Sequence, residues 1–364
     1  PDGTRIALTK SAGEDGTEVF VRWMDAEGAT SQITHFEHTP KNLQWSPDGK
    51  WIAFTANIPG GSKWGVKLPP KPKGAKWTAE PRIIEIRNYR RDRVGFLTGY
   101  DHLFIVPSNG GTATQITEGE GWGIGGGGFD WTPDGNHIVF GGYTAPRNNN
   151  IPDQSFIYKV NVKSTEVTKL TNQIGSWRSP SVSPDGKLVT YIGSAEFIDT
   201  FNTPEVRVIG IDGSNEHALI VDPSGPTSKP EWDRNGKSIY VNINHRGDTD
   251  VFNIDMRGNL KRVTDGRHRF RVSSYSDKGI AAGTYSDPTG DGIIATTNTR
   301  GNGNITHLVN VNEDIFMDTD HGKVEEINYK ASDGTDVHGW IMYPPNFNPT
   351  KKYPLVLNIH GGPH

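Results

Sequence analysis

The sequence contains no cysteine, and it has no long run of apolar residues. The absence of cysteine excludes a disulfide-stapled scaffold and thiolate-based zinc sites, and it fits oxidising and reducing compartments equally well. Without about 18 consecutive apolar residues there is no candidate transmembrane helix. No charged-then-apolar leader precedes Pro1, so localisation stays open between the cytoplasm and the periplasm or exterior.

The sequence also lacks a large excess of positive or negative charge. The chain has 38 Lys and Arg against 42 Asp and Glu, a formal net charge of −4. Nothing in this balance favours binding to nucleic acid or to an anionic membrane surface. The 12 histidines are scattered, and we expect neither a metal nor a cofactor.

Glycine, proline and aromatic residues are abundant. The chain has 44 Gly, 24 Pro, 10 Trp, 11 Tyr and 14 Phe. This composition is typical of short strands joined by many tight turns, and it argues against disorder.

A five-residue segment recurs along the chain. Its copies are Trp45–Gly49 (WSPDG), Trp131–Gly135 (WTPDG), Val182–Gly186 (VSPDG), Trp232–Gly236 (WDRNG), a weaker Tyr275–Gly279 (YSDKG) and a truncated Pro1–Gly3 (PDG). Proline presets φ, Asp or Asn tolerates the next position, and glycine closes the turn in the left-handed region. The segment therefore predicts a tight turn between two antiparallel strands.

Two further features accompany most of these anchor turns. The third and fifth residues after the glycine are apolar, as in Ile52 and Phe54, which predicts a strand with one buried face. An aliphatic residue followed by Thr closes a later hairpin at Ile33–Thr34, Ile116–Thr117, Leu170–Thr171 and Val263–Thr264.

The spacing of the anchors predicts the architecture. Most successive anchor glycines are about 43 to 51 residues apart, as four short strands per unit require. Gly49 and Gly135 are twice that distance apart, so we expect a unit without an anchor near residue 92, containing the strand Leu103–Val106. The prediction is an all-β, seven-bladed β-propeller over residues 1–321; a linear solenoid is the alternative.

The repeat stops at Gly322. The segments 323–330 and 337–343 predict a hairpin, and Tyr353–His360 (YPLVLNIH) predicts an apolar strand of the kind buried in a parallel sheet. The glycine-rich turn Gly361–Gly362 follows. Residues 322–364 are therefore expected to be the first strands of an α/β-hydrolase domain, cut off after this turn.

These features together resemble a known family. The PDG-type repeats, the insertion Lys71–Trp77 (KPKGAKW), the strand Asp101–Pro107 (DHLFIVP) and the terminal His360–Pro363 (HGGP) are similar to the acylaminoacyl-peptidase branch of the prolyl oligopeptidase (S9) serine peptidases. The resemblance implies a propeller that limits access to a hydrolase domain with a Ser-Asp-His triad. It also implies that the backbone N–H of Gly362, supported by Gly361, helps to hold the oxyanion.

The chain departs from the family in one respect: it contains no Gly-x-Ser-x-Gly segment for the nucleophile. We expect the triad beyond residue 364, in a missing segment or a separate chain, and no hydrolysis by this chain alone. The resemblance implies hydrolysis of short peptides, of acylaminoacyl-peptidase, dipeptidyl-peptidase or oligopeptidase type. Arg178 is a candidate contact to the peptide. The sequence does not decide whether the protein forms a homo-oligomer. The alternative is a TolB-like propeller that binds a protein and catalyses nothing.

Overall fold

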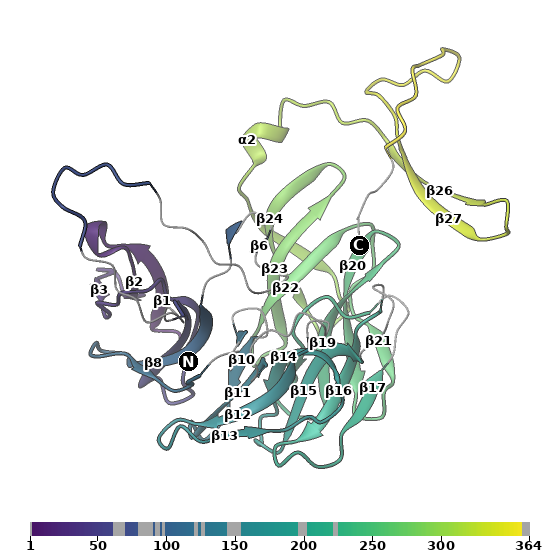
Figure 1. Cartoon of the computed structure of the whole chain (residues 1–364). Coiled ribbons are helices and arrows are strands. Elements are labelled where there is room, and N and C mark those ends of the chain that lie inside the picture. Colours follow the sequence, from purple (N-terminus) through teal and green to yellow (C-terminus); the bar gives the residue numbers. More distant parts are fainter. Residues whose placement is uncertain are drawn as a thin grey trace. The chain divides into compact units, whose positions relative to one another are not determined.

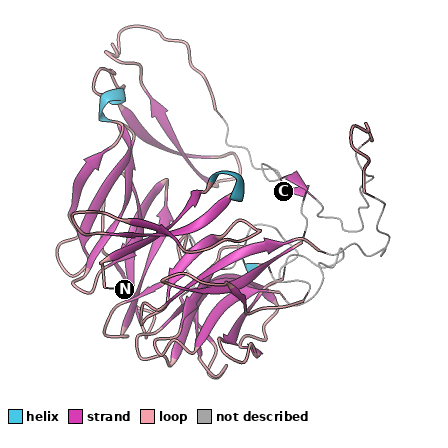
Figure 2. Cartoon of the chain, turned by 90° about the vertical axis from the view of Figure 1, so that its left-hand side faces the viewer, coloured by secondary structure: helices cyan, strands magenta, loops and turns pink. Residues whose placement is uncertain are grey.

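A computed structural model of the chain describes residues 2–60, 70–78, 90–91, 95–96, 99–119, 123–124, 128–143, 154–195, 202–220 and 225–358. The architecture is all-β with almost no helix (Figures 1 and 2). Two helical segments have defined bounds, the 3-10 turn η1 (Gly13–Asp15) and α2 (Glu313–Phe316). The chain forms two compact units, unit 1 from residues 1–197 and 204–219 and unit 2 from residues 198–203 and 220–364.

Unit 1 contains one three-stranded and three four-stranded antiparallel sheets. The first sheet is β1 (Arg5–Ser11), β2 (Thr17–Trp23) and β3 (Thr30–Gln32). The second is β4 (Lys41–Trp45), β5 (Trp51–Ile58), β8 (Tyr100–Pro107) and β9 (Thr114–Gln115). The third is β10 (Phe129–Trp131), β11 (His137–Gly142), β12 (Phe156–Asn161) and β13 (Val167–Lys169). The fourth is β14 (Gly175–Val182), β15 (Leu188–Ala195), β16 (Glu205–Gly210) and β17 (His217–Ile220).

Unit 2 contains an eight-stranded sheet made of two four-stranded halves. The first half is β18 (Glu231–Trp232), β19 (Ser238–His245), β20 (Asp248–Asp255) and β21 (Leu260–Arg262). The second is β22 (Arg269–Tyr275), β23 (Ile280–Asp287), β24 (Gly290–Asn298) and β25 (Ile305–Asn310). The halves meet at one parallel pair, Thr249 with Arg269.

The anchor turns form as predicted. Gly49 has a φ of 69°, and its N–H donates to the carbonyl of Ser46 at 2.9 Å. The Ser46 hydroxyl donates to Asp48 Oδ1 at 2.7 Å. The same contacts recur in the turns Thr132–Gly135 and Ser183–Gly186. Each turn joins the first two strands of its sheet.

The apolar residues after the anchors form the cores. Most of the predicted pairs are fully buried: Ile52 and Phe54, Ile138 and Phe140, Val189 and Tyr191, Ile239 and Val241. The first sheet is the exception, because Ile6 is 47% exposed. Ile6 lies on β1, the edge strand of a three-stranded sheet, so no strand before its anchor covers it.

The aliphatic-Thr marker has a structural cause. Each threonine is buried just past the last strand of its sheet, and its Oγ1 accepts a backbone N–H from the neighbouring strand. The donors are Val19 for Thr34 (2.9 Å), Leu103 for Thr117, Ile157 for Thr171 and Val251 for Thr264 (3.0 Å each). The hydroxyl thus extends the strand ladder where the backbone leaves it, which satisfies a buried donor.

The unit expected near residue 92 is not a separate sheet among the described residues. The strand Leu103–Val106 is part of β8, and β8 pairs along its whole length with β5, the strand that follows the anchor Gly49. Residues 59–99 therefore separate two paired strands of the second sheet, and in the described part of this segment β6 (Arg90–Arg91) pairs with β7 (Gly95–Phe96). The described residues contain six sheet units, so a seventh is not confirmed.

The hairpin after Gly322 is present as β26 (Val324–Lys330) and β27 (Asp336–Met342). It contacts the preceding sheet of unit 2. Glu326 pairs with Arg267 (2.6 Å) and Arg246 (3.3 Å), and the Arg267 guanidinium lies 4.6 Å from the Trp340 ring centroid. The apolar segment predicted as the next strand is not a strand over residues 353–358, and Leu355 is 89% exposed. Its backbone has no strand partner among the described residues, so the hydrogen bonds that define a strand are not made.

Candidate functional site

The predicted site residues fall in two places. Gly361 and Gly362 lie outside the described residues. Arg178 lies on β14, the first strand of the fourth sheet, where its Cα pairs with that of Ile192.

Arg178 sits at an irregularity of β14. The register with β15 shifts between Arg178 and Ser181, and Ser179 has a φ of 56°. A serine in the left-handed region is uncommon, and such strain persists only where the surroundings hold it. The bulge changes the direction in which the side chains of the strand point.

The Arg178 side chain is half-buried, and among the described residues it has no hydrogen-bond or ion-pair partner. Burial lowers the pKa of its guanidinium, because the charged form loses hydration. Arginines removed from water are usually paired with a carboxylate. The N–H donors of the Arg178 guanidinium are therefore not used within the described part of the sheet.

The first strands of three successive sheets lie side by side at this site. The Asp130 carboxylate of β10 accepts from Gln44 Nε2 of β4 at 2.6 Å, and from the backbone N–H of Val182 of β14 at 2.9 Å. Trp131 Nε1 donates to the Gln44 carbonyl at 3.4 Å. One aspartate thus fixes β14, and with it Arg178, against the two neighbouring first strands.

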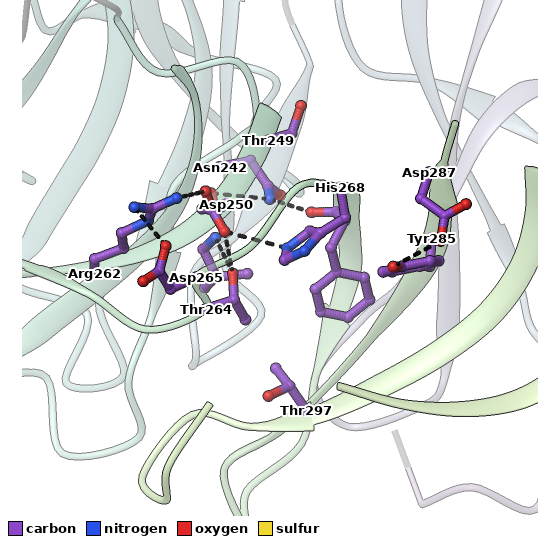
Figure 3. Close-up of polar contacts among 12 residues, drawn as sticks. Asn242, Thr249, Asp250, Arg262, Thr264, Asp265, His268, Tyr285, Asp287 and Thr297 are labelled. Atoms are coloured by element: carbon purple, nitrogen blue, oxygen red, sulfur yellow. Dashed lines mark hydrogen bonds and ion pairs between the residues drawn. The ribbon is translucent and has the colours of Figure 1, made fainter. Parts of the chain in front are cut away.

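Unit 2 contains a buried polar cluster, the Asp250 cluster, formed by Asp250, Arg262, Thr264 and His268 (Figure 3). Asp250 is fully buried on β20. Its oxygens contact Arg262 Nη2 at 2.5 Å, Thr264 Oγ1 at 3.0 Å and His268 Nε2 at 3.2 Å. Burial opposes ionisation, but the bonds from His268, Arg262 and Thr264 outweigh it and lower the pKa of Asp250.

An aspartate beside a histidine also occurs in the catalytic triad of serine hydrolases, where the histidine accepts the proton of the nucleophilic hydroxyl. The hydroxyl in the cluster, that of Thr264, donates to Asp250 and accepts the Val251 N–H. The Thr264 hydroxyl is therefore used in hydrogen bonds within the sheet, and it does not donate to His268 as a nucleophile would. The cluster holds the loop after β21 against β20.

Asn242 joins the two halves of the unit 2 sheet (Figure 3). Its side chain is buried on β19, where Nδ2 donates to the Phe270 carbonyl at 2.7 Å and Oδ1 accepts the Val272 N–H at 3.1 Å. Both partners lie on β22. The amide thus adds side-chain hydrogen bonds to the backbone pair between the halves, Thr249 with Arg269.

Neither the Asp250 cluster nor Asn242 was predicted from the sequence. Two features of the sequence could have indicated them. Asp250 precedes the marker Val263–Thr264 by one hairpin, and Asn242 is the one amide inside the apolar strand Ile239–Ile243. Within the described ranges, no three His, Asp or Glu side chains gather as metal ligands. No helix found there is long and apolar enough to cross a membrane.

The sequence is similar to known peptidases. The model of the family "Dipeptidyl peptidase IV (DPP IV) N-terminal region" matches residues 80–199. Dipeptidyl-peptidase 5 of Porphyromonas gingivalis is 26% identical over 340 residues, covering 88% of this chain and 47% of the relative. The uncharacterized peptidase YuxL of Bacillus subtilis is 24% identical over 390 residues, covering 100% and 56%. The chain spans about half the length of these curated relatives.

Solved structures share the fold. Pyrococcus horikoshii acylaminoacyl peptidase matches 97% of this chain and 51% of its own, with a TM-score of 0.71 and 15% identity. TolB from Acinetobacter baumannii matches 83% of this chain and 62% of its own, with a TM-score of 0.51 and 16% identity. Together with the family match and the dipeptidyl-peptidase relatives, this shared fold supports a likeness of the chain to the prolyl oligopeptidase (S9) family of peptidases.

Proposed function

We propose that this chain is the access-controlling part of a serine peptidase that hydrolyses short peptides. In this proposal the sheets of residues 1–321 are blades of one β-propeller, and residues 322–364 begin an α/β-hydrolase domain whose Ser-Asp-His triad lies beyond residue 364. The seven-bladed ring predicted from the repeat needs one sheet more than the six described. Acylaminoacyl-peptidase, dipeptidyl-peptidase and oligopeptidase specificities all fit this description.

One observation carries the proposal. The likeness to acylaminoacyl peptidase extends over 97% of the chain, whereas that to TolB extends over 83%. The hairpin β26–β27 after the last sheet supports the same conclusion, because its Glu326 and Trp340 contact Arg267 in the loop between β21 and β22. A free-standing propeller has no need of this hairpin.

The proposed mechanism is acyl transfer. The serine attacks the scissile carbonyl, the triad histidine takes its proton, and the carbonyl oxygen becomes an oxyanion. The N–H of Gly362, in a turn supported by Gly361, donates to that oxyanion together with the N–H that follows the serine. Arg178 contacts the bound peptide from the propeller side.

The test is the substitution Gly362→Pro in the complete polypeptide, which removes the proposed N–H donor. Loss of one such donor typically lowers kcat by about 10²–10³, or roughly 2.7–4 kcal/mol. Gly362→Ala keeps the N–H and serves as the control, and the melting temperature of each variant reports folding. Unchanged peptide turnover in a folded Gly362→Pro protein would overturn the role of Gly362.

The second candidate is a TolB-like module that binds a protein and catalyses nothing. The TolB likeness favours it for the sheets alone. Reaction of the native polypeptide with a fluorophosphonate separates the two candidates, since this reagent requires an activated serine.

A further inference from the structure

The inference concerns Arg178 and rests on the proposed function, because it names the chemistry of the peptide that this residue would bind. Arg207, in the same sheet, shows how a partly buried arginine is paired. Arg207 Nη1 lies 2.9 Å from Glu205 Oε1, and Arg207 Nε lies 3.4 Å from Glu216 Oε1. Arg178 has no such carboxylate among the described residues.

The backbone around Arg178 follows a pattern of unit 1. A residue with left-handed φ stands three positions before the last residue of the first strand in three successive sheets: Asn42 (55°), Gly128 (68°) and Ser179 (56°). Gly128 lies against Ser179, since a Cβ at Gly128 would be 3.6 Å from the Ser179 Cα. The irregular segments of β10 and β14 therefore lie side by side.

A second cation occupies the equivalent place in the second sheet. Lys41 precedes Asn42 as Arg178 precedes Ser179, and the register of β4 with β5 also shifts just after it. Lys41 is exposed, and it has no ion-pair partner among the described residues. The bulges of β4 and β14 thus each present an uncompensated positive charge.

Asp130 does not neutralise this charge. Its two oxygens accept from Gln44 and from the Val182 N–H, and burial is the cause of the lowered pKa of Arg178, with no neighbouring charge contributing. A half-buried guanidinium without a partner binds a carboxylate well, because part of its dehydration has already taken place in the free protein.

We propose that Arg178 is a specificity-determining residue that binds a carboxylate of the peptide, with Lys41 adding to the local positive potential. The carboxylate is either the free C-terminus of a short peptide or an Asp or Glu side chain. Both sources offer the planar pair of oxygens that matches the guanidinium fork.

The test measures binding to this 364-residue chain by isothermal titration calorimetry. The probes are acetyl-Ala-Ala-Phe with a free carboxylate, the same peptide as its amide, and the amide of acetyl-Ala-Glu-Phe. We expect at least one carboxylate-bearing peptide to bind about tenfold or more tightly than the uncharged amide. Tighter binding of the first peptide identifies the C-terminus as the source, and tighter binding of the third identifies a side chain.

Three variants make the test specific. Arg178→Gln removes the preference, Arg178→Lys keeps the charge and restores part of it, and Lys187→Gln, an exposed cation in the β14–β15 turn, leaves it unchanged. Circular dichroism confirms folding of each variant. If the acid and amide peptides bind equally to the wild type, or if Arg178→Gln keeps the preference, the inference is wrong while the proposed function stands. If none of the peptides binds, both the inference and the proposed peptide contact of Arg178 are wrong.

Discussion

Arg178 and Arg207 lie in the same four-stranded sheet of unit 1, and only Arg207 is paired with carboxylates among the described residues. Burial acts against the charge of both. At Arg207 the hydrogen bond that the guanidinium donates to Glu205 and the nearby charges outweigh burial and raise the pKa, whereas at Arg178 burial lowers the pKa. Arg207 therefore has a structural role, whereas the ligand role of Arg178 is the one proposed above.

This difference predicts opposite effects on stability. Arg207→Gln leaves the partly buried Glu205 and Glu216 without their cation, and we expect it to cost about 1.5–3 kcal/mol of unfolding free energy. Arg178→Gln removes an unpaired charge and should leave stability unchanged or raise it by about 0.5–2 kcal/mol. Urea unfolding followed by tryptophan fluorescence measures both. A large loss of stability in Arg178→Gln would mean that the guanidinium has a structural partner.

The Asn242 amide should be necessary for joining the halves of the unit 2 sheet. Asn242→Leu leaves the Val272 N–H and the Phe270 carbonyl without their partner, and each unsatisfied buried group costs about 1–3 kcal/mol. We expect a lower urea midpoint and faster hydrogen exchange of the Val272 amide. Asn253→Leu, in the neighbouring strand, removes an amide that bonds within its own half of the sheet and is the control. Equal exchange of Val272 in both variants would contradict this role.

The Asp250 cluster predicts a direction for the pH dependence of stability. Its carboxyl has a lower pKa in the folded chain than its ordinary value of 3.8, so the folded state binds that proton less readily than the unfolded state does. The stabilisation is therefore complete above the ordinary value and is lost as the pH falls through the folded pKa.

Urea unfolding of the wild type and of Asp250→Asn between pH 7 and pH 2 measures this dependence. The difference between the two proteins should be constant near neutrality and should shrink at acidic pH. A difference that instead grows toward acidic pH would show that the Asp250 pKa is raised by folding.

Close approach of two strands makes Gly193 of β15 sensitive to substitution. A Cβ at Gly193 would lie 2.0 Å from the Ser176 carbonyl oxygen of β14, so Gly193→Ala must push apart the strands that position Arg178. We expect a loss of about 1–3 kcal/mol in thermal or urea unfolding. Gly142→Ala in β11 is the control, because its Cβ would meet neighbours at an ordinary 3.6 Å. Equal stability of the two variants would contradict the strand geometry.

Much of the fold follows from local chemistry and was therefore predictable. The anchor turns, the buried residues after them and the hairpin β26–β27 each depend on residues close together in the sequence. The aliphatic-Thr marker was recognised as a pattern, but its cause, a hydroxyl that accepts a neighbouring strand's N–H, required the register.

The remainder depends on contacts between distant residues. The count of seven units is not confirmed among the described residues, because β8, expected in the seventh unit, pairs with β5 of the second sheet, and spacing alone does not show which strands pair. Arg178 was chosen from the sequence, whereas its lack of a carboxylate partner required the structure. Asn242 and the Asp250 cluster join strands whose pairing the sequence does not display.

The most direct test of the proposed peptidase is to treat the native polypeptide that contains this chain with a fluorophosphonate and to map the modified residue. We predict one labelled serine, located beyond His364, and reduced labelling when Gly362→Pro is introduced. Absence of labelling in a folded polypeptide that extends past His364, or a labelled serine within residues 1–364, would contradict the proposal.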